Sequence, residues 1–458
     1  MLTLRDRFAG EKHRGISRRS ALKAGFLGVG GLGLADLLKL RAQGAAARKD
    51  TAVILLWLDG GPSQLETYDP KPEAPVEYRG PYGTIETNVP GIRIADRLPH
   101  HARHADKMVL VRSLHHDTGD HFAGAHWMLT GRFGSTAVNL PQKYPSVGSI
   151  AAKVRGARAP GIPPYVGLPA AQSVYLFPGY QGAAYLGAAF NPFDVDTRQK
   201  YLPANSTLQI NRPRCFDEFR AAQAGRLEDR CALLEHFDRL RRHVDSSGVM
   251  ASLDEYQRQA VEMILSGKAQ QAFDLEKEDP RIAQRYGTSP WGRYTLMARR
   301  LVEAGVTFVT VDMPHWDDHS NIDKGHGYKL GPLDQAVGAL LDDLTERSLL
   351  GRVLVVVMGE FGRTPRINNG QPGIPIPGRD HWGSAISVML AGGGLRTGQV
   401  VGATNARAEH PSHRPLTPDD LLATIYHVLG IDPTIAFPDR AGRPIPILDV
   451  GQPIVEVI

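Results

Sequence analysis

The chain has 458 residues, of which 53 are Lys or Arg and 48 are Asp or Glu, so its formal net charge is +5. Hydrophobic residues make up 42% and charged residues 22%, a composition that excludes a disordered or collagen-like chain. Two cysteines cannot staple a chain of this length, which excludes a disulfide scaffold. No run of about 18 apolar residues lacks a charge, so no stable membrane span is expected.

The positive charge is concentrated at the beginning of the chain. Residues 1–47 hold nine of the 53 basic residues and three of the 48 acidic ones, which leaves 44 basic and 45 acidic residues in the remainder. A nearly neutral remainder without a basic stripe and interleaved aromatics argues against a nucleic-acid partner.

The first segment has the order of features typical of an export signal. Residues 17–23 (SRRSALK) contain a twin-arginine motif, a short glycine-rich apolar stretch covers 24–34, and Ala45 to Ala47 provide small residues for cleavage. We therefore expect a signal peptide over 1–47, read by the twin-arginine export machinery, and one domain over 48–458 that acts in the periplasm or outside the cell. An amphipathic surface helix is the alternative. Cys215 and Cys231 could pair there, although two unrelated buried thiols are favoured.

Apolar runs and helical periodicities predict the elements of the remaining chain. Continuous apolar runs predict strands buried on both faces at 52–58, 108–111, 306–311, 353–358 and 386–390. Helical spacing predicts helices at 294–303, 333–344 and 417–430, the last with Thr417 as cap and Gly430 after its end. The stretch 215–285 is expected to be mostly helical, and 130–210 to form an elaborated surface. Alternating helices and buried strands indicate an α/β three-layer sandwich with a mostly parallel central sheet.

Polar side chains gather where the predicted strands end. The first strand runs into Asp59 and Ser63, the third into Asp312 and residues 315–319, and the fourth into Glu360; His115, His116 and His121 follow the second strand, and residues 379–382 precede the fifth. Carboxylates crowded at the carboxyl edge of a sheet repel one another, and a divalent cation removes that cost. Mixed carboxylate and imidazole ligands suit zinc, manganese or iron, whereas oxygen ligands alone suit calcium or magnesium.

Each of these residues also has a structural interpretation. Asp59 alone could cap a helix, and the three histidines could be surface residues. Glu360 could pair with Arg363 or Arg366 in an ion pair.

Six stretches resemble the alkaline phosphatase and sulfatase superfamily, and within it a large family of exported sulfatase-like proteins of unknown function. These stretches are 58–63, 125–132, 316–319, 359–365, 378–383 and 417–430. The resemblance covers nearly the whole chain after residue 48, and it implies an alkaline-phosphatase-like fold. It also implies metal ligands at the positions of Asp59, Asp317, His319, Glu360 and His381. Aligned through residues 129–132, His121 stands at the position of the sulfatase nucleophile, with Asp120 before it.

Three departures separate this chain from characterised members of that superfamily. The sulfatase motif of Cys or Ser followed by x-Pro-x-Arg is absent, so formylglycine chemistry is not expected. Phe361 stands where a His or Asn usually binds metal. The spacing of Asp317 and His319 is shorter than the usual phosphatase spacing.

The functional hypothesis is an exported metal-dependent hydrolase acting on a phosphate or sulfate ester of a small molecule or glycan, with zinc or calcium as its metal. In this hypothesis His121, beside Asp120, is the nucleophile or general acid/base, and Arg363 or Arg379 holds the anionic oxygens. Ser63 is a second candidate nucleophile, although Pro62 and Ser63 also read as a helix cap. The alternative is a non-catalytic metal- or ligand-binding member of the same fold.

Overall fold

A computed structural model describes residues 50–134, 142–171, 181–196, 202–206, 210, 213, 216, 258–263 and 266–458. Within it, Asp50–Ile458 form one compact unit. The predicted signal peptide, Cys215 and Cys231 lie outside the described residues.

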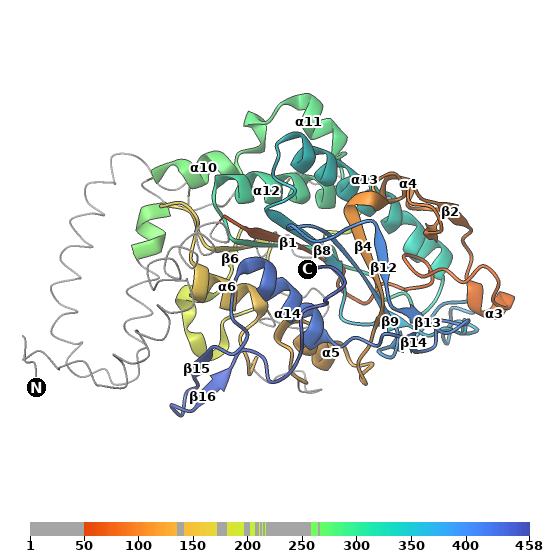
Figure 1. The fold of residues 1–458 in the computed structure, drawn as a ribbon. Helices are drawn as coiled ribbons and strands as arrows, with labels where there is room; N and C mark the ends of the chain where they lie inside the picture. Colours follow the sequence, from red (N-terminus) through yellow and green to blue (C-terminus); the bar gives the residue numbers. More distant parts are fainter. Residues whose placement is uncertain are drawn as a thin grey trace, which may run out of the picture. The chain divides into compact units, whose positions relative to one another are not determined.

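An eight-stranded sheet forms the centre of this unit (Figure 1). Its strands, in spatial order, are β12 (Gln399–Val401), β4 (Met108–Leu114), β11 (Ile386–Gly392), β8 (Val353–Met358), β1 (Ala52–Trp57), β7 (Phe308–Asp312), β5 (Tyr165–Leu168) and β6 (Phe193–Asp194). All neighbours pair in parallel except β11, which is antiparallel to both β4 and β8. The predicted mostly parallel sheet is confirmed.

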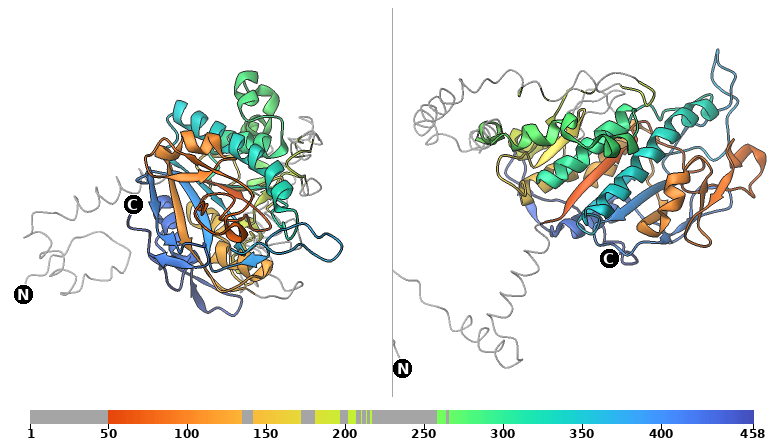
Figure 2. Two further views of the ribbon diagram at one scale, coloured as in Figure 1. Left: turned by 90° about the vertical axis from the view of Figure 1, so that its right-hand side faces the viewer. Right: turned by 90° about the horizontal axis from the view of Figure 1, so that it is seen from above.

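Helices cover both faces of the sheet and make three layers (Figures 1 and 2). One face carries α4 (Pro99–Arg103), α10 (Lys268–Phe273), α12 (Pro290–Ala304) and α13 (Ile322–Glu346), and the other carries α5 (His121–Thr130), α6 (Val147–Arg155) and α14 (Pro418–Leu429). Alternate residues of β1 enter the two cores: Ile54 and Leu56 pack on one side, Leu55 and Trp57 on the other. Burial on both faces is why this strand is a continuous apolar run.

Smaller elements complete the unit. They are α3 (Val76–Arg79), β2 (Thr84–Glu86), β3 (Arg93–Ala95), α11 (Pro280–Arg285), β9 (Gly362–Arg363), β10 (His381–Trp382), β13 (Ala403–Thr404), β14 (Pro411–His413), β15 (Ala436–Pro438), β16 (Pro444–Pro446) and 3-10 turns at Ala105–Lys107, Ala184–Leu186, Ala188–Phe190 and Leu275–Lys277.

The five predicted strands all lie in the sheet, and the ends of α14 match their signals. Thr417 forms a capping box with Asp420, whose carboxylate accepts from the Thr417 amide at 2.9 Å. Gly430 adopts the left-handed conformation with φ 65° directly after the helix. In contrast, α13 begins well before the predicted 333, at Ile322, and contains Pro332.

The expectation that 130–210 forms only a surface elaboration is wrong. This region supplies β5 and β6, which extend the sheet beyond β7, with Tyr165 paired to Phe308. The four residues of β5 lie between Pro164 and Pro169 and include a glycine, so they form no apolar run. Such a short strand is identified by its position beside β7 and not by its own sequence.

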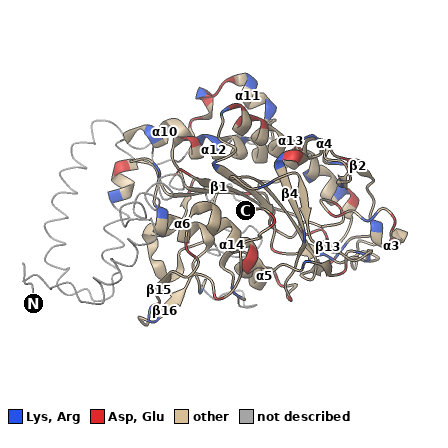
Figure 3. Cartoon of the chain, viewed as in Figure 1, with Lys and Arg blue, Asp and Glu red and all other residues tan. Residues whose placement is uncertain are grey.

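None of the described helices is long and apolar enough to cross a membrane. Figure 3 shows basic and acidic side chains interspersed over the described part of the chain. This interspersed charge agrees with the near neutrality of the chain after residue 47.

Candidate metal centre

Three adjacent strands bring three carboxylates to one edge of the sheet. Trp57 pairs with Asp312 across β1 and β7, and with Met358 across β1 and β8. Asp59 and Glu360 each follow their strand by two residues, so they leave the sheet at the same level beside Asp312. All three side chains are buried, with 2%, 2% and 1% exposure for Asp59, Asp312 and Glu360. We call these three residues the carboxylate cluster.

The carboxylate cluster is electrostatically undercompensated. Three buried oxygens lack a hydrogen-bond partner among the described residues: both carboxylate oxygens of Asp312 and the Oε2 of Glu360. Burial raises the pKa of Asp312 well above its usual value, and the charges of Asp59 and Glu360 raise it further. The other oxygen of Glu360 accepts from the Gly60 amide at 2.9 Å. A buried carboxylate without a donor is costly, so the two oxygens of Asp312 and the Oε2 of Glu360 fit a bound cation.

Two glycines allow the chain to turn immediately after β1. Gly60 and Gly61 have φ of +109° and +80°. A Cβ atom on Gly60 would lie 2.7 Å from the Asp317 amide nitrogen, and one on Gly61 would lie 2.4 Å from the Phe361 ring. The glycine pair therefore lets this turn pack against the loops that follow β7 and β8.

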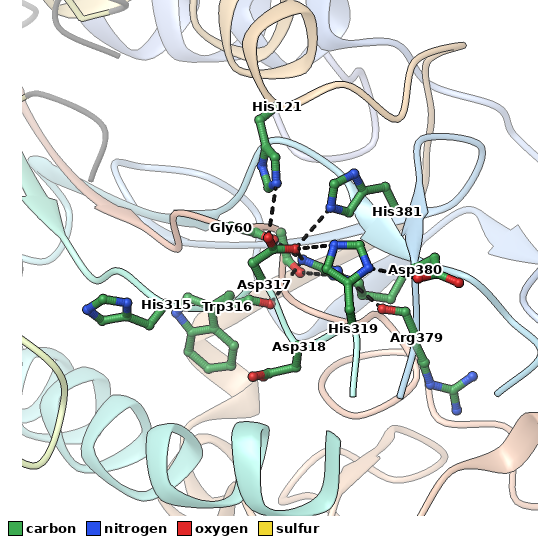
Figure 4. A network of polar contacts seen from close by, with 12 residues as sticks. Gly60, His121, His315, Trp316, Asp317, Asp318, His319, Arg379, Asp380 and His381 are labelled. Atoms are coloured by element: carbon green, nitrogen blue, oxygen red, sulfur yellow. Dashed lines mark hydrogen bonds and ion pairs between the residues drawn. The ribbon is translucent and has the colours of Figure 1, made fainter. Parts of the chain in front are cut away.

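A second cluster surrounds Asp317 (Figure 4). The Nε2 atoms of His319 and His381 lie 3.0 and 2.9 Å from Asp317 Oδ1, and His121 Nε2 lies 3.4 Å from Oδ2. Potential ligand atoms of His121, Asp317 and His381 all lie within 4.8 Å of one another. We call Asp317 and the three histidines the imidazole cluster.

Each of the three imidazoles is held by its other nitrogen. Nδ1 lies 2.7 Å from the Gly119 carbonyl oxygen in His381, 2.7 Å from Asp380 Oδ1 in His319, and 2.7 Å from Glu360 Oε1 in His121. All three partners only accept, so each Nδ1 carries a proton. In a neutral ring, Nε2 then presents a lone pair to the Asp317 carboxylate, an arrangement that a metal ion between them stabilises.

The histidines differ in their electrostatics. Burial lowers the pKa of His381, which favours its neutral, ligand-competent form. The hydrogen bond to Asp317 raises the pKa of His319. For His121 burial opposes the charged ring, but hydrogen bonds to Asp317 and Glu360 outweigh it and raise the pKa to about 10. Thus His121 joins the two clusters and is the histidine best placed to hold a proton.

Arg363 forms a buried ion pair with Asp317 of the imidazole cluster. Its side chain is fully buried, and its Nη2 lies 2.7 Å from Asp317 Oδ1. It also donates to the carbonyls of Gly60, Gly61 and Trp316. The ion pair considered for Arg363 with Glu360 is not formed, because the guanidinium pairs with Asp317 instead. In this geometry Arg363 orients Asp317. Its contact with ester oxygens stays a prediction.

The other predicted anion-binding arginine and the second nucleophile are also buried. Arg379 pairs with Glu66 at 2.8 Å and donates to the Tyr78 carbonyl at 2.7 Å. Ser63 is fully buried, its hydroxyl donates to Glu66, and its amide donates to His326 Nε2 at 3.0 Å. These contacts link the turn after β1 to α13 and to the loop that contains Arg379. A catalytic role of Ser63 or Arg379 stays a prediction.

Asp120 determines where His121 stands. The Asp120 carboxylate caps α5 by accepting from the amides of Phe122 and Ala123 at 3.0 and 2.9 Å. His121 is therefore the first residue of the helix. Phe361, which takes the place of a usual metal ligand, packs its ring 4.9 Å from that of His121 and 4.5 Å from that of His381.

The family of the chain follows from its match over nearly all described residues. Residues 50–458 match the family described as "Protein of unknown function (DUF1501)". The chain belongs to this family. The predicted membership of an uncharacterised family is thereby confirmed. A search of curated proteins finds no relative.

Solved structures that this DUF1501 chain is similar to include a sulfatase and an alkaline phosphatase, as the motifs predicted. A 2-O GAG sulfatase has 10% identity over 88% of this chain and 73% of its own, with a TM-score of 0.39. The alkaline phosphatase from the Antarctic bacterium TAB5 has 13% identity over 83% and 98%, with a TM-score of 0.36. The lipoteichoic acid synthase LtaP from Listeria monocytogenes has 11% identity over 84% and 73%, with a TM-score of 0.34. TM-scores below 0.5 assign no role to individual residues.

The predicted metal ligands divide between the two clusters. Asp317, His319 and His381 meet in the imidazole cluster, whereas Asp59 and Glu360 belong to the carboxylate cluster. The structure adds Asp312 to the carboxylate cluster. The sequence feature that could have identified it is its position at the end of an apolar strand, comparable to that of Glu360 after the 353–358 strand. It adds Asp380 as the partner of His319, a role that only the folded loop reveals.

A third buried network, of hydrogen bonds around Asp318, supports the loop that contains Asp317 and was not predicted from the sequence. Asp318 Oδ2 lies 2.6 Å from His326 Nδ1 and 2.7 Å from Lys329 Nζ, both on α13. Burial lowers the pKa of Lys329 to about 8. Their spacing of three residues on one helix was the available signal.

Proposed function

We propose that this chain is a metal-dependent hydrolase acting on a phosphate or sulfate ester. The observation that supports this proposal most strongly is the imidazole cluster, in which three rings anchored through Nδ1 turn Nε2 toward one carboxylate. Histidines that ligate metals have this arrangement: the N–H of the other ring nitrogen donates a hydrogen bond to a carbonyl or carboxylate oxygen. The buried carboxylate cluster beside it adds a second set of oxygen donors.

The two clusters fit different divalent ions. The nitrogen and oxygen donors of Asp317, His121 and His381, with His319 turned to the same carboxylate, fit zinc. The oxygen donors of the carboxylate cluster fit calcium or magnesium. When bound, such an ion supplies Lewis-acid polarisation of an ester oxygen.

The remaining residues position and protect these donors. Asp380 and the Gly119 carbonyl orient His319 and His381, and Arg363 orients Asp317. Glu360 accepts the Nδ1 proton of His121 and stabilises positive charge on the ring in the metal-free protein. With an ion bound in place of the Nε2 proton, His121 is a neutral ligand. The Phe361 ring packs against the rings of His121 and His381.

A non-catalytic binding protein with the same metal site is the second candidate. The burial of Ser63 and Arg363 favours it, because two predicted contributors to catalysis are held in structural contacts instead. The two candidates differ in turnover and not in metal binding.

The test is metal content together with turnover of aryl phosphate and aryl sulfate esters, measured on the purified full chain. The hydrolase predicts bound metal and turnover, and both are lost in His381→Ala. The exposed His413, on β14, provides the control His413→Ala, which should change neither. Metal without turnover on a broad ester panel favours the binding protein, and a wild-type chain that binds no metal defeats both.

We also propose that the chain is exported by the twin-arginine route, on the basis of residues 17–23. Replacing Arg18 and Arg19 together by Lys should keep the chain in the cytoplasm. The proposal fails if fractionation shows that the doubly substituted chain leaves the cytoplasm as efficiently as the wild type.

A further inference from the structure

A cleft of about 780 Å³ opens beside the imidazole cluster. Tyr78 of α3, residues 364–369, Asp380, Trp382 and residues 409–410 line it. Asp380 Oδ1 lies 2.7 Å from His319 Nδ1, and His319 Nε2 lies 3.0 Å from Asp317 Oδ1. One imidazole ring therefore separates the cleft wall from the carboxylate at the centre of the cluster. A molecule filling the cleft would lie one imidazole ring away from a group bound at Asp317.

The chemistry of the walls selects a class of ligand. The half-buried rings of Tyr78 and Trp382 provide apolar surface, and the Arg407 guanidinium lies over one face of the Tyr78 ring, 4.9 Å from its centroid. Asp380, Glu409 and the exposed Asn369 provide hydrogen-bonding groups. A sugar ring matches both, since its C–H faces pack on aromatic rings and its hydroxyls donate to carboxylates and amides. Arg366 is the one Lys or Arg among the residues that line the cleft, against two carboxylates. A long polyanion needs an excess of basic groups, which this lining does not offer.

The cleft walls are held in place before any ligand binds. Trp382 Nε1 donates to the Glu409 carbonyl at 2.7 Å, which anchors the ring. Asn368 Nδ2 donates to the His319 carbonyl at 3.0 Å and to Asp380 Oδ2 at 3.2 Å. Small-ligand pockets are usually preformed, and a preformed site loses less conformational entropy when its ligand binds.

We propose that this cleft binds a sugar unit of a glycan, so that the substrate class is a glycan ester. The ester part of this inference rests on the proposed hydrolase function. The binding of the sugar unit rests only on the cleft and can be tested in the absence of metal.

The test is binding of the full chain, freed of metal by a chelator, to an array of defined neutral and sulfated oligosaccharides. The positives are then measured by calorimetry with wild type, Trp382→Ala and Tyr78→Ala. We expect binding to at least one oligosaccharide class and at least a tenfold loss of affinity in each variant. Phe133→Ala, which removes a 56% exposed ring outside the cleft lining, is the control and should bind as the wild type does. No binding to any oligosaccharide, or binding that survives both cleft substitutions, overturns the proposal.

Two variants separate this proposal from the proposed function. Tyr78 belongs to α3 and is not a member of the imidazole cluster, so Tyr78→Ala should lose the sugar and keep the metal. His381→Ala should lose the metal and keep the sugar. Sugar binding by a wild-type chain that holds no metal would support the cleft and defeat the hydrolase. Metal and turnover without sugar binding would overturn the cleft and leave the hydrolase standing.

Discussion

Asp312 is the residue at which stability and metal binding oppose each other. Its carboxylate is buried, has no hydrogen-bond donor among the described residues, and faces two further carboxylates. Without a cation this arrangement costs free energy of folding, and with one it becomes a ligand.

Asp312→Asn should therefore change stability in opposite directions in the two states. The raised pKa of Asp312 means that the metal-free folded protein must keep this carboxyl protonated at neutral pH, which the unfolded chain need not do. Asn avoids that cost and should raise the free energy of unfolding of the chelator-treated protein by about 1 kcal/mol. It should also abolish most of the increase in Tm that calcium or magnesium, the ions that fit the carboxylate cluster, gives the wild type. Thermal unfolding with chelator and with added calcium, magnesium or zinc measures both effects.

Asp343 provides the matched control. It is equally buried but pairs with Arg299 at 2.8 Å and accepts from Tyr286 at 3.0 Å. Asp343→Asn should lower stability in both states, because it breaks a buried ion pair, and should leave the metal-induced shift unchanged. A metal-induced shift that persists in Asp312→Asn would remove Asp312 from the site.

At the residue scale, the sequence predicted which polar residues lie near the site better than it predicted the contacts that each of them makes. The positions of Asp317, His319 and His381 followed from a resemblance, and the structure brings them together. Arg363 and Ser63 carry groups that could act on an ester, but burial and local hydrogen bonds decide their roles. Burial of a polar side chain depends on contacts far along the chain, such as Arg363 with Gly60, and no local pattern contains them.

At the scale of elements, the turn after β1 is the part whose geometry is most demanding. Gly61 and Gly91 have nearly the same φ, +80° and +83°, but only Gly61 is crowded. A Cβ atom there would overlap the Phe361 ring, whereas a Cβ atom on Gly91 would meet nothing within 4 Å.

The pair Gly61→Ala and Gly91→Ala separates backbone strain from close packing. Gly91→Ala should cost only the strain of a left-handed residue, about 1 kcal/mol. Gly61→Ala should cost at least about 2 kcal/mol more and should weaken metal binding, because the turn must move away from the loops after β7 and β8. Urea unfolding and metal titration measure these effects, and equal costs for the two variants would contradict the packing argument.

Helix α14 carries a carboxyl group that makes stability depend on pH. Asp419 lies in its first turn, is 4% exposed, and has its pKa raised by burial from 3.8 to about 6. The folded state therefore holds this proton more tightly than the unfolded chain does. The contribution to the free energy of unfolding falls as the pH rises from about 4 to about 6, and is constant above that range.

Asp419→Asn should remove this dependence. Relative to the wild type, the variant should gain on the order of 1–3 kcal/mol at pH 7 and close to nothing at pH 3. Denaturant unfolding at a series of pH values measures the difference. A difference that does not change between pH 3 and pH 7 would show that burial does not shift this group.

At the scale of the whole molecule, the continuous apolar runs predicted the central strands because these strands are buried on both faces. The same reasoning missed β5 and β6, which are short and take their place from pairing with β7 and with each other. The antiparallel direction of β11 likewise follows from the path of the chain, which no residue pattern in the strand records. Placing the strands in order is what brings the ends of β1, β7 and β8 together and creates the carboxylate cluster.

Metal analysis of the purified full chain measures directly whether the imidazole cluster holds a divalent metal. After incubation with zinc, calcium, magnesium and manganese and removal of free ions, we expect at least about one bound ion per chain. We expect loss of at least one of these ions in Asp317→Asn and no loss in the His413→Ala control. A wild-type chain that retains no divalent metal, or an Asp317→Asn variant that retains as much as the wild type, would contradict metal binding by the imidazole cluster.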